Sequence, residues 1–123
     1  MPEEQKDLST NDIIKNYQNT IEEKIKTIED LFEKFKNLPN QENIEAFFAF
    51  LHKIKGSAGI YGYQKVSDET KVAVEILRPY KDKEEKDPIT KDKIDKIGSQ
   101  MEIVKQEFVK EPDLTEFKKL DML

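Results

Sequence analysis

The chain has 123 residues, of which 38% are charged and 36% hydrophobic, and its formal net charge is −5. That length fits one domain with a single modest core, and the acidic balance argues against a nucleic-acid-binding surface of the usual basic kind. The chain contains no cysteine, which excludes disulfide frameworks and thiolate chemistry.

Membrane insertion and secretion are not expected either. Uncharged runs such as AFFAFLH are far too short to cross a bilayer, and the N-terminal MPEEQKDLST lacks the features of a signal peptide. We therefore expect a cytoplasmic protein that does not contact a membrane.

The first third of the chain carries apolar residues at steps of three and four, which is the spacing of an amphipathic helix. This stripe consists of Ile13, Tyr17, Ile21, Ile25, Ile28, Phe32 and Phe35. It predicts one long helix that begins near the capping residues STND and ends at NLPN. Pro39 enforces the end, because the residue before a proline is pushed out of helical geometry.

A second helix is predicted over residues 41–60 and a third over residues 64–80, with Gly62 in the turn between them. The stripe of the second helix is Ile44, Phe47, Leu51, Ile54 and Ala58. Pro79 lies near the frayed end of the third helix. The looser stripe of this helix is Val66, Ala73, Ile76, Leu77 and Tyr80.

A charged linker, KDKEEKD, precedes the fourth predicted helix. This helix is expected to open at DPIT, with Asp87 as its cap and Pro88 in its first turn. Its stripe has the spacing of a bundle seam: Ile94, Ile97, Met101, Val104 and Phe108. Helices of this kind cannot each bury a stripe alone, so we predict an all-α fold, an antiparallel four-helix bundle (up-down-up-down) over residues 1–110.

Residues 111–123 form a tail that keeps Leu114, Phe117 and Leu120 on one face. Two interpretations stay open. The tail docks as a short C-terminal helix, or it packs only against a partner.

The only histidine of the chain, His52, lies on the second predicted helix. At about 100° per residue, it falls about 140° from the centre of the apolar stripe. We therefore expect His52 to be exposed to water near the middle of the helix. The residues that share its face are Glu45, Phe48, Lys55, Gly56 and Gly59.

An exposed lone histidine is most often an ordinary surface residue. A metal site would need a second ligand at helical spacing, and Glu45 and Glu69 are feeble candidates, so no metal is expected. A hydrolase triad would need an activated serine and a buried acid beside the histidine, and Ser57 falls on the wrong side of the helix.

The neighbours of His52 favour phosphoryl acceptance instead. Lys55, one turn later, places a cation where an anion bonded to the imidazole would lie. Gly56 and Gly59 remove side chains that would block a second protein, and Phe48 offers it an apolar contact. A neutral imidazole nitrogen is a good nucleophile near pH 7, and phosphohistidine can pass its phosphoryl group on.

At these residues the chain resembles a known family. The segment HKIKGSAGIYGY is similar to the signature of histidine-containing phosphotransfer (HPt) domains, in which Lys and Gly follow the histidine at the third and fourth positions and another Gly lies ten positions on. The predicted helix order extends the resemblance over residues 8–110. The matching residues are His52, Lys55, Gly56, Ala58 and Gly62, with Val66 in the apolar position beyond.

The resemblance implies that His52 takes a phosphoryl group from an aspartyl phosphate on a response-regulator receiver domain and donates it to another receiver. This is the chemistry of a multistep His–Asp phosphorelay in two-component signal transduction. Lys55 would stabilise the phosphoryl charge, and Gly56 would let the receiver close over the imidazole. The expected partner-binding residues are Glu45, Phe48, Gly59 and Tyr63.

The resemblance also limits the cofactors and partners. The Mg²⁺ of such a relay belongs to the receiver domain, so we expect no cofactor on this chain. No nucleotide-binding loop or kinase motif is present, so the chain is expected to be a monomeric phosphoryl carrier and not an enzyme with its own ATP site. A hybrid sensor histidine kinase is a further expected partner.

One position departs from the family pattern. Many HPt domains place Gln or Glu on the third helix, twenty-two positions after the histidine, to hydrogen-bond the ring or the phosphate. Here that position is Val74, with Glu75 next to it. Three explanations stay open. The third helix is shifted in register, the polar contact to the histidine is absent, or this contact comes from Glu69, Thr70 or Lys71.

Two other functions stay open. In the first alternative, the bundle is a non-catalytic interaction module that binds a receiver or kinase without turning over phosphate. In the second, it is the phospho-accepting domain of a larger histidine kinase. Met1 counts against the second alternative.

Overall fold

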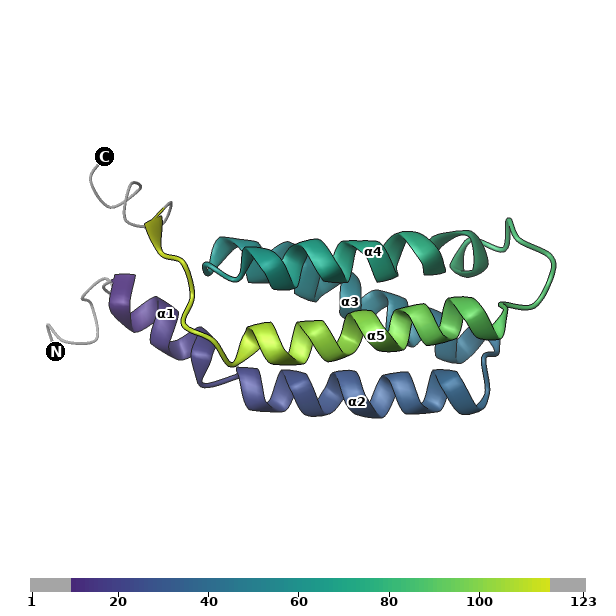
Figure 1. Ribbon diagram of the computed structural model, residues 1–123, viewed down its shortest axis with the longest axis horizontal. Helices are drawn as coiled ribbons and strands as arrows, with labels where there is room; N and C mark the ends of the chain where they lie inside the picture. Colours follow the sequence, from purple (N-terminus) through teal and green to yellow (C-terminus); the bar gives the residue numbers. More distant parts are fainter. Residues whose placement is uncertain (1–9, 116–123) are drawn as a thin grey trace, which may run out of the picture.

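The computed structural model describes residues 10–115. Within this range all regular structure is helical, and the longer helices α2–α5 form an elongated bundle (Figure 1). The helices are α1 (Thr10–Gln18), α2 (Ile21–Asn37), α3 (Gln41–Ile60), α4 (Gln64–Lys81) and α5 (Lys91–Phe108).

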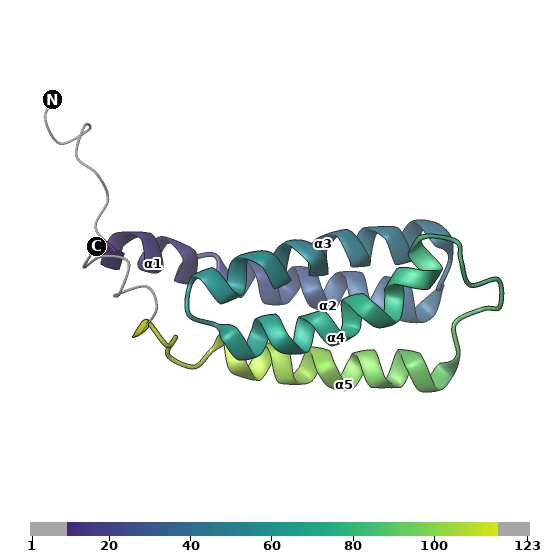
Figure 2. The ribbon, with the colours of Figure 1, turned by 90° about the horizontal axis from the view of Figure 1, so that it is seen from above.

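Helices α2–α5 alternate in direction, and each packs on two others: α2 on α3, α3 on α4, α4 on α5, and α5 back on α2. Figure 2 shows that α1 extends beyond the bundle at the end where α3 turns into α4. The predicted all-α antiparallel bundle is therefore confirmed. The core is filled by the buried stripes, and its largest fully buried side chains are Phe35, Phe47, Phe108, Ile28, Leu51, Ile54, Leu77 and Ile97.

The first third of the chain forms two helices, so the prediction of one long helix is wrong. The break lies at Asn19 and Thr20, where the Thr20 hydroxyl donates a hydrogen bond of 2.6 Å to the carbonyl of Tyr17. The Tyr17 ring stacks on Tyr61, with ring centroids 4.1 Å apart. Because this contact fixes α1 against the end of α3, the chain changes direction before α2, and Ile14 is buried in α1 where the stripe pointed to Ile13.

Helix α3 has the predicted bounds, and α4 extends one residue beyond its predicted end. Asn40 caps α3, since its side chain accepts a hydrogen bond of 2.8 Å from the backbone N–H of Asn43. Pro39 lies between α2 and this cap, as predicted. The stripe of α3 is buried in full, which confirms the orientation of this helix.

Gly62 forms the turn between α3 and α4 with a φ of 89°, a conformation that favours glycine. A Cβ at this position would lie 2.5 Å from the carbonyl oxygen of Asp113. The N–H of Asp113 in turn donates a hydrogen bond of 2.8 Å to the Gly62 carbonyl. The turn therefore holds the chain that leaves α5. The predicted tail residues Phe117 and Leu120 lie outside the described residues.

The N-cap of α5 lies three residues after the predicted cap, Asp87, and the helix begins at Lys91. Thr90 is the N-cap, and its hydroxyl accepts a hydrogen bond of 3.3 Å from the N–H of Lys93. Asp87 and Pro88 lie in the preceding connection, so the predicted capping role is wrong. Ile89 is buried directly before Thr90, and burial of this side chain sets where the helix can begin.

Candidate functional site

His52 lies near the middle of α3 and is exposed, as the helical wheel predicts. Its ring makes no hydrogen bond to any residue in the described range. The side chain therefore presents its ring nitrogens to solvent, where a second molecule can approach them.

Within the described residues, the ring of His52 contacts the ring of Phe48, one turn earlier on α3. The two ring planes are 7° from parallel, and their centroids lie 5.9 Å apart. Phe48 is only 6% exposed. The expectation that Phe48 lies on the exposed face is therefore wrong, because α4 packs over this edge of α3 and covers it.

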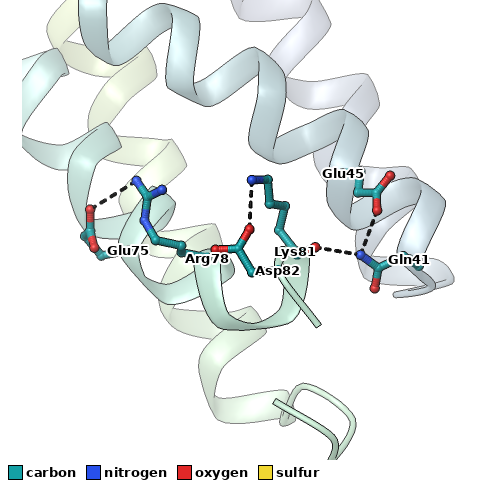
Figure 3. A network of polar contacts seen from close by, with 6 residues as sticks. All are labelled: Gln41, Glu45, Glu75, Arg78, Lys81 and Asp82. Carbon is teal, nitrogen blue, oxygen red and sulfur yellow. Dashed lines mark hydrogen bonds and ion pairs between the residues drawn. The ribbon is translucent and has the colours of Figure 1, made fainter. Parts of the chain in front are cut away.

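Two cations from α4 lie against the Phe48 ring. The guanidinium carbon of Arg78 is 5.2 Å and the Lys81 Nζ 4.9 Å from its centroid. Arg78 also pairs with Glu75 at 3.5 Å, and Lys81 pairs with Asp82 at 2.8 Å (Figure 3). Sequence reasoning missed Arg78 and Lys81. Arg78 is the only arginine of the chain, and a helical wheel of α4 places both residues on the side that faces α3.

Figure 3 also shows how the ends of α3 and α4 are tied together. The side-chain amide of Gln41 donates hydrogen bonds to Glu45 at 2.8 Å and to the backbone carbonyl of Lys81 at 2.9 Å. Glu45 is exposed, so it stays available on the face that carries His52. This arrangement holds Lys81 at a fixed height along α3.

Lys55 and Gly56 are both on the His52 side of α3. Lys55 is half-buried beside α4, and its backbone carbonyl accepts a hydrogen bond of 2.7 Å from Ser67. Gly56 is exposed, and a Cβ built there would meet no atom within 4 Å. The space above Gly56 is therefore open to a partner.

Two further residues predicted to bind a partner are covered wholly or in part by the bundle. Tyr63 is 4% exposed and packs on Phe108, with centroids 5.5 Å apart, so the prediction that it contacts a partner is wrong. Gly59 is half-buried, and a Cβ there would lie 3.3 Å from the side-chain oxygen of Gln64. Gly59 thus allows the close approach of α4 to α3.

Val74 is fully buried, and its side chain has no polar atom with which to contact His52. Of the three suggested substitutes, Thr70 is also fully buried, Glu69 is half-buried and Lys71 is exposed. None of them hydrogen-bonds His52. The polar contact of many HPt domains therefore has no counterpart in the part of the chain that the structure describes.

The described residues contain no group of three or more His, Asp and Glu side chains that could hold a metal ion. Residues 10–115 also contain no helix that is long and apolar enough to cross a membrane.

The fold and the site together define a class: a helical bundle that displays a single histidine near the middle of one helix. Comparison with protein families is consistent with this class, since the model of the Hpt domain matches residues 12–107. The chain belongs to the Hpt domain family. A comparison with curated proteins found no significant match.

Membership of this family makes the chain a histidine phosphotransfer module of two-component signalling. Hpt domains interact with the receiver domains of such systems.

Proposed function

We propose that the chain carries a phosphoryl group on His52 between receiver-domain aspartates in a multistep His–Asp phosphorelay. The observation that supports this most is the position of His52, which is the only histidine and is exposed on α3 within the matched residues. A phosphotransfer module with one histidine has one candidate acceptor.

The proposed transfer is a nucleophilic displacement at phosphorus. The lone pair of the unprotonated ring nitrogen forms the N–P bond, the P–O bond to the receiver's aspartate breaks, and its electron pair restores the carboxylate. The reverse step passes the group to the next receiver. This chemistry needs mainly positioning and charge neutralisation, which suits a site with few residues.

Lys55 supplies the charge in this proposal, because its amine can reach an anion on a side chain one turn away. The metal and the catalytic acidic pocket belong to the receiver, and the chain acts as a carrier without its own ATP site.

The face around His52 fits the docking of another protein. Ala49 and Gly56 are exposed and small, and each lies within one turn of His52. Ile60, two turns after His52, is 64% exposed. Small exposed residues allow close approach, and one large apolar side chain beside them favours burial against a partner.

Replacement of His52 by Gln tests the proposal. A phosphorylated receiver should label the parent chain with acid-labile, base-stable phosphate and should leave His52→Gln unlabelled. The melting temperature should stay within about 2 °C of the parent, because exposed substitutions change stability little. Phosphate on the variant would refute His52 as the acceptor, and receiver binding without any label on the parent would favour the interaction module.

A further inference from the structure

We infer that Phe48 is a positioning residue, whose ring sets the orientation of the His52 imidazole for transfer. The inference rests on the proposed function of His52, and it explains how the ring is oriented where Val74 offers no hydrogen bond.

The contact between the two rings has the geometry of an offset stack. Aromatic pairs prefer centroid separations of about 4.5–7 Å in offset or edge-to-face arrangements, and this pair lies at 5.9 Å with planes 7° from parallel. The spacing of four residues on a helix brings such side chains together. An exposed histidine without this neighbour would be free to exchange among the staggered rotamers.

Phe48 is suited to hold the histidine because it is itself fixed. It is 6% exposed, and Arg78 and Lys81 both lie within the separation of about 6 Å at which cations are attracted to aromatic rings. Each cation is anchored in turn by a carboxylate on or next to α4. Helix α4 therefore fixes Phe48, and Phe48 orients His52.

Orientation matters because the attacking nitrogen, the phosphorus and the leaving oxygen must align. A displacement of about 1 Å in such a geometry can reduce a rate by a factor of about 100. Stacking against one face of the imidazole leaves both ring nitrogens free to react. A hydrogen bond to the ring would instead occupy one of the two nitrogens.

The test compares Phe48→Leu with the control Phe47→Leu. Phe47 is the adjacent residue, is 0% exposed, and packs on Phe32 and Phe35 of α2, not on His52. Phe48→Tyr keeps the aromatic face and serves as the rescue variant. The measurements are melting temperature, the NMR signals of the His52 ring protons, and phosphorylation rates with two donors. One donor is a phosphorylated receiver, and the other is phosphoramidate, a small molecule that needs no docking surface.

We expect Phe48→Leu to move the His52 ring signals toward those of a free histidine, because the ring current of Phe48 is lost. Transfer from the receiver should slow about tenfold, while labelling by phosphoramidate changes less than about twofold, since only the docked reaction depends on alignment. Phe48→Tyr should restore both the signals and the rate. Phe47→Leu should lower the melting temperature at least as much and leave ring signals and transfer unchanged.

Unchanged ring signals in Phe48→Leu, or an unchanged rate from the receiver, would overturn the inference. An equal loss of transfer in Phe47→Leu would also overturn it, since stability alone would then account for the effect. If neither donor labels the parent chain, the proposed function fails, and the ring signals alone decide whether Phe48 orients His52.

Discussion

Gly56 and Gly59 lie close together on α3, but their surroundings differ. Nothing lies within 4 Å of a Cβ at Gly56, whereas a Cβ at Gly59 would meet Gln64 and Ser67 of α4. Glycine in a helix interior is destabilising by about 1 kcal/mol relative to alanine. Helix packing accounts for Gly59. It does not account for Gly56, where the proposed function requires access of a partner to His52.

Gly56→Leu should therefore retain or raise stability, by up to about 1 kcal/mol from helix propensity. It should also slow transfer from a receiver, because the leucine projects about 40° around the helix from His52, into the path of the partner. Thermal melting and phosphate transfer are measured side by side.

Gly59→Leu is the matched control for this substitution. Its side chain would press on α4, so it should lower the melting temperature. The access explanation fails if Gly56→Leu melts well below the parent or accepts phosphate at the parent's rate.

At the scale of the element, α1 is joined to α3 by Tyr17. Its hydroxyl lies 3.1 Å from the Ser57 hydroxyl, within hydrogen-bond distance, and its ring stacks on Tyr61. Burial raises the pKa of Tyr17, an effect that the hydrogen bond with Ser57 opposes. Ser57, which sequence reasoning considered only as a nucleophile, therefore positions α1.

Tyr17→Phe should lower the free energy of unfolding near pH 8 by about 1 kcal/mol, the typical contribution of one hydrogen bond. The difference from the parent should shrink as the pH rises past about 10, where tyrosine in an unfolded chain loses its proton. Because the pKa of Tyr17 is raised in the folded state, Tyr17 loses its proton more readily in the unfolded chain. Rising pH therefore destabilises the parent through Tyr17. The Tyr17→Phe variant has no hydroxyl at this position and lacks this effect.

Urea unfolding at pH 8 and at pH 10.5 measures this difference. Tyr63, whose pKa burial also raises, is present in both proteins, and its charge is one of the causes that raise the pKa of Tyr17. A difference that stays constant across this interval would contradict the role assigned to the Tyr17 hydroxyl.

At the scale of the whole molecule, one continuous core joins α2–α5, and tyrosines lie at both ends of this core. Tyr17, Tyr61 and Tyr63 gather where α1 meets the α3–α4 turn, with Tyr17 within 6 Å of each of the other two rings. Tyr80 lies near the far end of α4, where its hydroxyl accepts a hydrogen bond of 2.8 Å from Lys93. Tyrosine signals therefore report on tertiary structure at both ends.

We expect the bundle to unfold as one unit, because no helix can bury its stripe without the others. Far-ultraviolet circular dichroism, which follows the helices, and the near-ultraviolet signal of the tyrosines should give the same melting temperature. Tyr80→Phe confines the tyrosine signal to the end near α1, and its two curves should also coincide. Separate transitions in either protein would show that one end opens before the other.

The bounds of α3, the full burial of its stripe and the exposure of His52 follow from the sequence alone. These properties depend on local geometry: a helix repeats every 3.6 residues, so the spacing of apolar residues determines which face is buried and where a lone histidine points. The HPt signature spans one helix and one turn, so it too can be identified without knowledge of the neighbouring helices.

Only the tertiary structure decided whether the residues at the edges of those faces are buried or exposed. Phe48 borders the exposed side of α3 and is buried because α4 packs over it. Tyr63 caps the start of α4 and is buried against Phe108 of α5. The break before α2 depends on a ring in the α3–α4 turn, and the cations beside Phe48 come from α4. A periodic pattern describes one helix, whereas burial at its edge depends on how closely the next helix packs, and that distance is set by side chains far away in the chain.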